Sequence, residues 1–470
     1  MNRLFGIILL AATTMPVWAQ QVLSLDSCRA LALRNNKQLG VAKVKQDVAG
    51  NLKKAARTKY LPKVNAMGGY MYTSREVSIL SSEQKDKLSS MGSTVGAVIG
   101  QLGFELPMVA DALNGVGQGI VDAFRTDTRN MFGGAVMVSQ PLFAGGAITA
   151  LNRMAEINLQ MAGNDINTMQ QATLYGTDQA YWTVVSLKQK KRLAEGFLSL
   201  VKKLDDDVQK MIREGVATRS EGLAVSVKVN EAEMAVMKVD NGLTLAKMLL
   251  CQICGLPSEA EITLADEDVE NIAVMDIAEV EVDKEEMLHN RPELKTLQNI
   301  VDINNQNVNF VKSGNLPKVM LMGGYAVSNP NVYDGFHRSF AGVWNVGVLV
   351  SVPVWNWGDV AYKARAAKGL TTMARLELEE AQEKMELQVT QSSHKVKEAR
   401  KRLQLAEANI KRADENLRCA NLGFHEGVMS STVVMEAQTA WLEAQSQKID
   451  AEIDVRLSQV DLRKAMGILE

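Results

Sequence analysis

Charge of one sign, aromatic side chains and metal ligands are all scarce in this 470-residue sequence. It carries 52 Lys+Arg against 54 Asp+Glu, a formal net charge of -2. The chain therefore lacks the excess of positive charge that binds a nucleic-acid phosphate backbone. Aromatic residues make up 5%, and four Cys and four His leave little material for a metal cluster. No Ser/His/Asp arrangement and no phosphate-binding loop motif occurs. The sequence therefore predicts no enzyme, no cofactor, no metal site and no nucleic-acid partner.

Proline is also sparse, and its distribution is informative. Nine prolines occur, and none of them falls in residues 142–256 or 354–470. An interior proline costs a helix about 3 kcal/mol, so proline-free runs of this length favour long helices.

The first twenty residues have the pattern of an export signal. A short basic start ending at Arg3 precedes an apolar stretch from Leu4 to Ala12, and Val17-Trp18-Ala19 supplies a small-residue cleavage context. We expect residues 1–20 to be a signal peptide and the mature chain to be exported. No later window of about 18 apolar residues predicts a membrane-spanning helix.

The chain contains an internal duplication. Residues 61–70 recur as 316–325 with eight of ten positions identical, at an offset of 255. Residues 136–146 match 348–358, and Glu214-Gly215-Val216 matches Glu426-Gly427-Val428, both at an offset of 212. The smaller offset means that the first half carries 43 additional residues between its strands. The additional residues lie within Thr73 to Asn130, a segment that is rich in Ser, Gly and Met and is predicted to be a surface loop.

Each repeat is predicted to run helix, strand, long loop, strand, long helix, turn, long helix. The predicted boundaries are a first repeat at 21–250 with strands near 63–73 and 132–142 and a hairpin at 147–250, a linker at 251–281, and a second repeat at 282–470 with strands near 318–328 and 343–355 and a hairpin at 358–467.

The predicted strands alternate apolar and mixed faces. In the fourth strand one face is continuously apolar (Trp344, Val346, Val348, Val350, Val352 and Val354), whereas the other includes Asn345, Gly347 and Ser351. Period-two segments of about ten residues suit a transmembrane β-barrel with one face toward lipid. A soluble antiparallel sheet with one buried face has the same periodicity. Four strands cannot close a barrel and lipid tolerates no open edge, so either the sheet is soluble or several chains share one barrel.

The helices have a heptad pattern with a large residue at a and a small residue at d, which favours close packing in a left-handed coiled coil. The a positions are Val389, Val396, Leu403, Ile410, Leu417 and Phe424, then Val434, Trp441, Lys448, Val455 and Leu462. The d positions are Ser392, Ala399, Ala406, Ala413, Ala420 and Gly427, then Ala437, Ala444, Ala451, Ser458 and Ala465. One helix over residues 360–426 would extend about 100 Å.

Together these motifs resemble the TolC family of outer-membrane efflux proteins over essentially the whole mature chain. The resemblance rests on the Leu-Pro-Lys-Val segments at the strand starts, the segment Gln140–Gly146, the Glu-Gly-Val turns and the segment Asn290–Lys295. The resemblance implies a mainly α chain with a membrane β-barrel: a homotrimer with four strands per chain, a twelve-stranded barrel in the outer membrane and a periplasmic α-helical coiled-coil tunnel. It also implies a periplasmic adaptor protein and an inner-membrane pump as partners, with outer-membrane lipid around the barrel. Prolines at barrel–helix junctions in the family match Pro62, Pro141, Pro317 and Pro353.

The two Glu-Gly-Val turns are the candidate functional site. A glycine at such a position ends a helix and lets the chain reverse, which is a sufficient structural explanation. In the family these turns form the periplasmic tip, where the adaptor docks. The resemblance therefore assigns this role to Gly215, Val216, Ala217 and Thr218 and to Gly427, Val428, Met429 and Ser430.

Many family members close the tip with acidic side chains on the helix after the second turn. Aligned from Gly427, one such position falls on Val433 and the next on Glu436, and the first repeat offers Glu221. Glu221 and Glu436 are thus the aperture candidates. Val433 removes one carboxylate of the pair, so cation blockage of the aperture is not expected.

The cysteines permit several states. Cys251 and Cys254 form the only CxxC pair, which suggests redox or metal chemistry, but they end an apolar helical run and lack further ligands. We favour packed thiols. Cys28 and Cys419 stand alone, and an oxidising periplasm permits disulfides whose pairing the sequence does not specify.

The predicted function is the exit channel of a tripartite efflux pump, passive and non-enzymatic. Two alternatives remain open at this point. One is the exit duct of a type I protein-secretion system, and the other is a structural periplasmic coiled-coil protein with a soluble sheet. The sequence does not identify the exported substrate.

Overall fold

A computed structural model of the chain describes residues 21–74, 76, 79–101, 106–125, 127–269, 290–333 and 337–469. The predicted signal peptide, residues 270–281 of the predicted linker and residues 282–289 of the second repeat lie outside the described residues. The chain divides into two compact units. The helical unit is drawn from Met1–Asn51, Glu156–Asn304 and Leu370–Glu470, and the sheet unit from Leu52–Ala155 and Asn305–Gly369. Each unit is described by itself.

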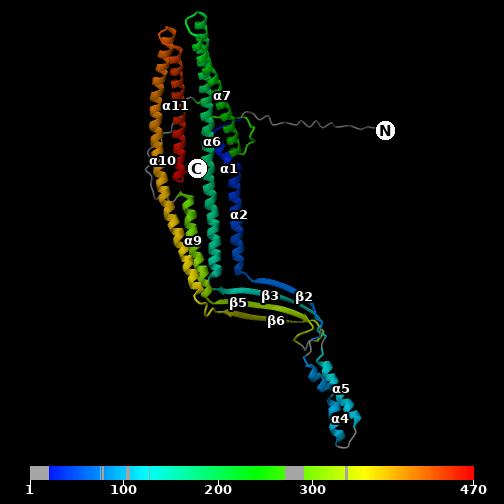
Figure 1. Ribbon diagram of the computed structural model, residues 1–470. Coiled ribbons are helices and arrows are strands. Elements are labelled where there is room, and N and C mark those ends of the chain that lie inside the picture. Colours follow the sequence, from blue (N-terminus) through cyan, green and yellow to red (C-terminus); the bar gives the residue numbers. More distant parts are fainter. Residues whose placement is uncertain are drawn as a thin grey trace, which may run out of the picture. The chain divides into compact units, whose positions relative to one another are not determined.

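Two long antiparallel hairpins dominate the helical unit (Figure 1). The first joins α6 (Ala147–Arg213) to α7 (Arg219–Cys254), and the second joins α10 (Asp359–His425) to α11 (Ser431–Ala465). The sequence placed these hairpins within a few residues of the observed bounds. The remaining helices of the unit are α1 (Leu25–Asn35), α2 (Lys37–Arg57) and α9 (Pro292–Lys312). A short parallel pair of β1 (Gln21–Leu23) and β4 (Ile262–Leu264) completes it. None of the described helices combines the length and apolarity that a membrane-spanning helix needs.

The predicted heptad register is confirmed by burial. On α10 the a residues are buried except Ile410, which is half-buried, and on α11 all five small d residues are buried. The exceptions are Ala413, Trp441, Lys448 and Leu462, which are half-buried, and Gly427, which is exposed in the turn after α10. Ala399, Leu403 and Ala406 pack against Ala451 and Val455 in one cluster. Residues from the predicted a and d positions of both helices therefore share one buried seam.

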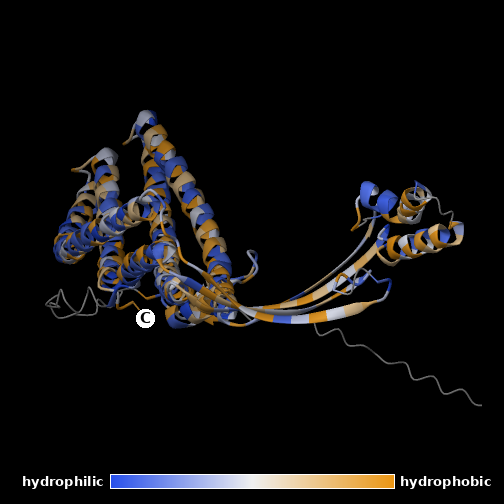
Figure 2. Cartoon of the chain, turned by 90° about the horizontal axis from the view of Figure 1, so that it is seen from below, coloured by the Kyte–Doolittle hydropathy of each residue, from blue (hydrophilic) through white to orange (hydrophobic). Residues whose placement is uncertain are grey.

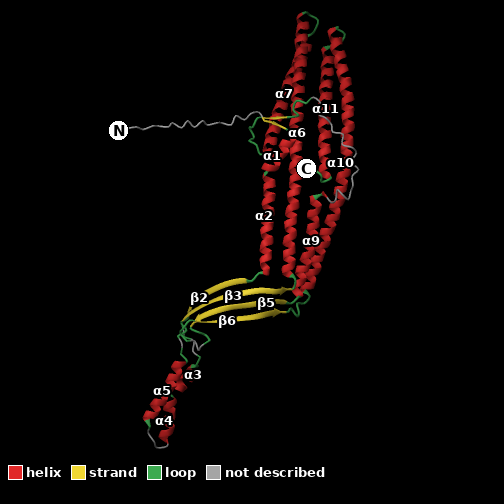
Figure 3. Ribbon diagram, turned by 180° about the vertical axis from the view of Figure 1, so that it is seen from behind, coloured by secondary structure: helices red, strands yellow, loops and turns green. Residues whose placement is uncertain are grey.

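The sheet unit holds a four-stranded antiparallel sheet in the order β2-β3-β5-β6, whose strands lie side by side in Figure 3. The strands are β2 (Lys63–Tyr72), β3 (Asn130–Ala144), β5 (Lys318–Asn329) and β6 (Ala341–Ser351). Short 3-10 turns, η1 (Thr58–Tyr60) and η2 (Ser313–Asn315), precede the two Leu-Pro-Lys-Val entries. The sequence extended the fourth strand to residue 355, which is wrong. The strand ends at Ser351, two residues before Pro353, which has no backbone N–H to donate to a sheet.

The strand register places the predicted apolar residues on one face. Val136 lies opposite both Ala66 and Tyr325, and Val348 lies opposite Leu321. Directly opposed residues in an antiparallel pair share a face, so this face continues across all four strands. It carries no Met. All six methionines of the strands lie on the other face, which also holds Lys63, Asn65, Ser139, Asn345 and Ser351; they are Met67, Met71, Met131, Met137, Met320 and Met322.

Both faces of the sheet are open in this chain. Every residue of β2 is exposed, as are nine of the eleven residues of β6. Orange and pale residues dominate these strands in Figure 2, whereas blue residues recur along the helices of the helical unit. Among the described residues, β2 pairs only with β3 and β6 only with β5, so each leaves one edge unpaired.

The insertion between β2 and β3 is helical, which corrects the predicted surface loop. It forms α3 (Ser82–Ser89), α4 (Met91–Gln101) and α5 (Pro107–Ala123). Within the sheet unit these helices connect the end of β2 to the start of β3 (Figure 3). Ser81 begins α3 with a capping box that includes Gln84.

Candidate functional site

The first helix-reversal turn ends α6 with a Schellman motif. Val216 N–H donates to the carbonyl of Met211 at 2.9 Å, and Gly215 N–H donates to that of Ile212 at 3.1 Å. Gly215 has φ 79°, a left-handed conformation that costs a residue with a Cβ about 1–2 kcal/mol. Nothing lies within 4 Å of the position that a Cβ would take there, so this conformation alone explains the glycine.

The second turn repeats this geometry at the end of α10. Val428 N–H donates to the carbonyl of Gly423 at 2.8 Å, and Gly427 N–H donates to that of Phe424 at 3.1 Å. Gly427 has φ 76°. The prediction that both Glu-Gly-Val glycines terminate helices is therefore confirmed.

Both turns lie at the same end of the helical unit (Figure 1). A shared apolar core beneath them joins the two hairpins, with Val208 and Val225 from the first and Phe424 and Val434 from the second. Above this core the valines face outward: Val216 is 70% exposed and Val428 is 77% exposed. We call Gly215–Thr218 together with Gly427–Ser430 the tip.

The two turns differ at the start of the helix that follows. Thr218 and Glu221 form a capping box: Thr218 Oγ1 accepts from Glu221 N–H at 3.2 Å, and Thr218 N–H donates to Glu221 Oε2 at 2.7 Å. These hydrogen bonds to the Thr218 backbone and side chain lower the pKa of the Glu221 carboxyl. At the second turn Ser430 makes no side-chain cap bond, and Val433 occupies the position equivalent to Glu221. The capping box thus accounts for Glu221 without an aperture role.

Glu436 lies on the exposed side of α11. It lines a shallow groove of about 490 Å³ between α7 and α11, shared with Glu231 and Glu443. Lys228, also in this groove, pairs with Glu231 at 3.1 Å. In the described part of the chain, no group of three or more His, Cys, Asp and Glu side chains is placed to hold a metal ion.

The four predicted junction prolines occupy three kinds of position. Pro62 and Pro317 immediately precede β2 and β5. Pro141 lies inside β3, where the pairing with β5 shifts register before Phe143. Pro353 follows the end of β6. Each is at a strand start, a bulge or beyond a strand end, where a missing N–H is tolerated.

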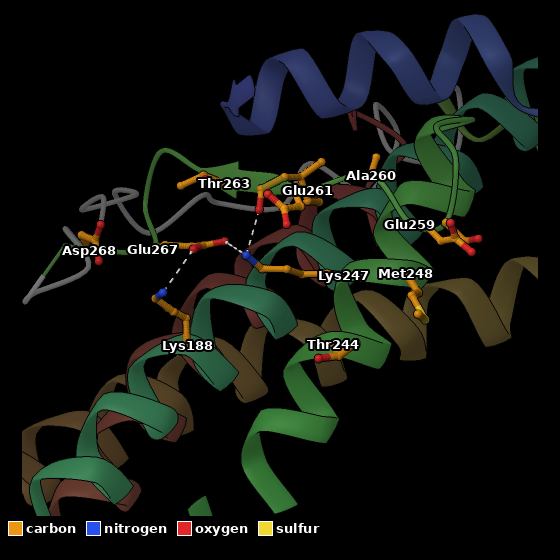
Figure 4. A pocket seen from close by; sticks show the side chains of 12 residues that line it. Lys188, Thr244, Lys247, Met248, Glu259, Ala260, Glu261, Thr263, Glu267 and Asp268 are labelled. Carbon is orange, nitrogen blue, oxygen red and sulfur yellow. Dashed lines mark hydrogen bonds and ion pairs between the residues drawn. The ribbon is translucent and has the colours of Figure 1, made fainter. Parts of the chain in front are cut away.

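A pocket at the end of α7 was missed by sequence reasoning (Figure 4). The buried carboxylate of Glu267 is approached from two helices, with Lys247 Nζ 2.9 Å from Oε1 and Lys188 Nζ 3.9 Å from Oε2. Lys247 also donates to the carbonyl of Ile262 in β4 at 2.8 Å. These contacts fix β4 onto α7, so they account for the two lysines structurally. No local spacing relates these residues, and the sequence offered no signal for them.

Comparison with known proteins identifies the family. Residues 29–256 and 285–468 match the family model described as outer membrane efflux protein. The chain belongs to the outer membrane efflux protein family. Its localisation is the outer membrane.

The individual relatives share little sequence identity with this chain. Outer membrane protein TolC of Vibrio cholerae serotype O1 is 25% identical over 171 residues, which span 36% of this chain and 39% of that relative. The outer membrane channel CmeC of Campylobacter jejuni is similar in structure with a TM-score of 0.75 and 16% identity, covering 95% of this chain and 86% of that one. The outer membrane protein VceC of Vibrio cholerae has a TM-score of 0.74 and 13% identity, covering 94% and 96%. The predicted mainly α fold of this family is therefore confirmed.

Proposed function

We propose that this protein is the exit channel of a tripartite efflux pump. It acts as a passive homotrimeric conduit that docks an inner-membrane pump through a periplasmic adaptor protein. Membership of the outer membrane efflux protein family supports this assignment. The observation that carries it is the sheet, which has two unpaired edges and two uncovered faces within one chain.

Such a sheet is incompatible with lipid unless other chains complete it. Every backbone polar group in a bilayer needs an internal partner, so an open edge is excluded there. Pairing β6 of one copy with β2 of the next removes both edges, and three copies give a closed barrel of twelve strands. The face with Trp344, Val346 and Val348 then meets lipid, and the Met-containing face lines the lumen.

Exposed apolar residues on α2 and α10 also support assembly of several copies. On α2, Val41, Val44 and Val48 are each more than half exposed and are spaced by three and four residues, so they share one side. On α10, the exposed Leu376, Leu387 and Leu405 are spaced by 11 and 18 residues, which also keeps them on one side of a helix. Neighbouring copies packing side by side would cover both stripes.

The domain division and site roles follow from this proposal. A signal peptide at 1–20 directs export, and repeats at 21–250 and 282–470 each contribute two strands and one hairpin, joined by the 251–281 linker. The tip is the adaptor docking surface, Glu436 is the aperture acid, and the four prolines mark the junctions of strands with helices.

The deciding experiment is fractionation followed by imaging. The protein should be extracted from outer membranes only with detergent, show heat-modifiable mobility, and give three-fold symmetric particles well over about 100 Å long. Recovery in the soluble periplasmic fraction would instead favour the periplasmic coiled-coil alternative. The type I secretion alternative shares the architecture, and it would gain support if deletion of the chain abolished secretion of a protein rather than export of small molecules.

A further inference from the structure

Three of the four cysteines converge in the core of the helical unit. Cys28 comes from α1, and Cys251 and Cys254 come from the last turn of α7. Cys28 and Cys254 are fully buried and Cys251 is 1% exposed, whereas Cys419 is exposed on α10. The three converging residues share one apolar cluster with Leu250 and the β1–β4 pair.

Within this cluster the side chain of Cys254 lies against Cys28. Cys254 Sγ donates a hydrogen bond to the backbone carbonyl oxygen of Cys28 at 3.7 Å. Cys251 Sγ is directed instead to the carbonyl of Ala260, at 3.9 Å. Cys254 therefore contacts Cys28, whereas Cys251, on the same helix, contacts Ala260.

The backbone at Cys254 is held by a contact with the end of α1. Asn35, which ends α1, donates from Nδ2 to the carbonyl of Cys254 at 2.8 Å. Gly255 follows with φ 71° and packs against Asn35 so closely that a Cβ would lie 2.4 Å from the Asn35 Cβ. These contacts hold the end of α1 against the end of α7, the two helices that carry Cys28 and Cys254.

We propose that Cys28 and Cys254 form a disulfide as the exported chain folds in the periplasm, while Cys251 and Cys419 remain thiols. The oxidant is a disulfide, carried by a thiol-oxidising protein or a small molecule, which reacts by thiol–disulfide exchange. One cysteine thiolate attacks a sulfur of the oxidant and releases one oxidant thiol. The second thiolate attacks the resulting mixed disulfide and releases the other. Two protein thiols and one oxidant disulfide thus give one protein disulfide and two oxidant thiols.

Burial determines when this reaction takes place. In the folded, reduced protein the interaction with the Cys254 thiol and desolvation raise the pKa of the Cys28 thiol, whereas the interaction with Cys28 lowers the pKa of Cys254, so the thiolate is scarce at Cys28 and favoured at Cys254. Full burial also blocks access of an oxidant to either sulfur. The bond must therefore form before the core closes. It links the start of the first repeat to the last turn of α7 and constrains the unfolded chain over 226 residues of separation.

Peptide mapping of the native protein tests the proposal. Wild-type channel is alkylated during extraction from outer membranes, denatured with alkylating agent present, digested without reductant and analysed by mass spectrometry. A linked peptide pair containing Cys28 and Cys254, two hydrogen atoms lighter than the sum of its reduced peptides, is expected, with Cys251 and Cys419 alkylated. Alkylation of all four cysteines, or a Cys251–Cys254 link, would overturn the proposal.

Matched variants give a second readout that needs no knowledge of the exported substrate. Cys251→Ala should retain the linked pair. Adding reductant should lower the melting temperature of wild type and Cys419→Ala but leave that of Cys28→Ala unchanged. If Cys28→Ala fails to fold, the wild-type peptide map still decides. Trimer formation and export are measured separately, so failure of this proposal leaves the proposed channel function untouched.

Discussion

Charged replacement of the tip valines should uncouple docking from assembly. Val216 and Val428 are 70% and 77% exposed above the apolar core that joins the hairpins, so removing them leaves that core intact. Complete burial of a valine is worth about 1.5–3 kcal/mol, so covering the exposed part of each gains about 1–2 kcal/mol. The pair is then worth about 2–4 kcal/mol per docking position, which corresponds to about 30- to 700-fold in affinity.

The double variant Val216→Glu/Val428→Glu should lose at least this affinity, because a partner covering the tip would also have to desolvate two carboxylates. In cells, a photocrosslinker placed at Val428 should capture the adaptor in the wild-type background and not beside Val216→Glu. Export should fail, while heat-modifiable trimers persist in the outer membrane.

The control is Ser220→Glu, which adds one carboxylate, as each single valine substitution does, at an exposed position in the first turn of α7 without removing apolar surface. It should export normally, since a carboxylate in the first turn of a helix is favourable. Normal export and crosslinking by the double valine variant would refute the docking role and leave the turns as helix reversals alone.

Three further substitutions test other parts of the structure. Val348→Arg should impair membrane assembly by about 2–4 kcal/mol relative to Gly347→Arg on the opposite face, and equal yields in outer-membrane fractions would contradict the face assignment. Ala406→Leu should overpack the seam with α11 and cost about 1–3 kcal/mol in thermal melts, whereas Lys411→Leu at an exposed position should change little. Glu221→Ala should remove the carboxylate half of the capping box, the bond from Thr218 N–H to Glu221 Oε2, and cost about 0.5–1.5 kcal/mol at pH 7. Because the folded-state pKa of Glu221 is lowered, this cost should be present above the ordinary Glu pKa of about 4.3 and vanish as pH falls through the lowered value; a gap that widens in acid would contradict this.

Periodic features of this fold could be predicted from the sequence because periodicity directly reports burial. The large-small heptad from Val389 onward is confirmed at most of its positions, and the alternation around Val348 is confirmed from Trp344 to Val350. The duplicated Glu-Gly-Val turns were equally readable, since a reversal needs a glycine in a left-handed conformation at Gly215 and Gly427.

The insertion was misread because its glycines have another role. Glycine-rich composition suggested a loop, but Gly92 and Gly117 sit in helices that approach closely. A Cβ would lie 1.9 Å from the Ala110 carbonyl oxygen at Gly92 and 1.8 Å from that of Leu88 at Gly117. Glycine here permits helix packing rather than chain reversal, and composition cannot distinguish the two.

Long-range polar contacts were also beyond sequence reasoning. Arg29 binds Asp178 in a bidentate pair, through Nε at 2.7 Å and Nη2 at 2.5 Å, across 149 residues of separation. The side chain of Asp178 is 0% exposed, so its position depends on a partner that no local spacing identifies. The Thr218–Glu221 cap, by contrast, has a signature in the sequence, Thr-x-x-Glu directly after a predicted turn, which was overlooked.

The Thr218–Glu221 cap bears on which acidic residue near the tip can act at an aperture. The duplication carries the same reversal into both hairpins, but the third residue of the following helix is Glu221 in one and Val433 in the other. In the first hairpin the carboxylate is bound by its own helix start, and these hydrogen bonds lower its pKa. A carboxylate held in this way is poorly suited to reach across a narrow passage, because doing so would break the cap. Glu436 instead lies one turn further along α11 and lines the groove toward α7, with Glu231 and Glu443 beside it. Any acidic control of the aperture would therefore depend on this groove rather than on the turns, and the turns would be left to serve as a docking surface.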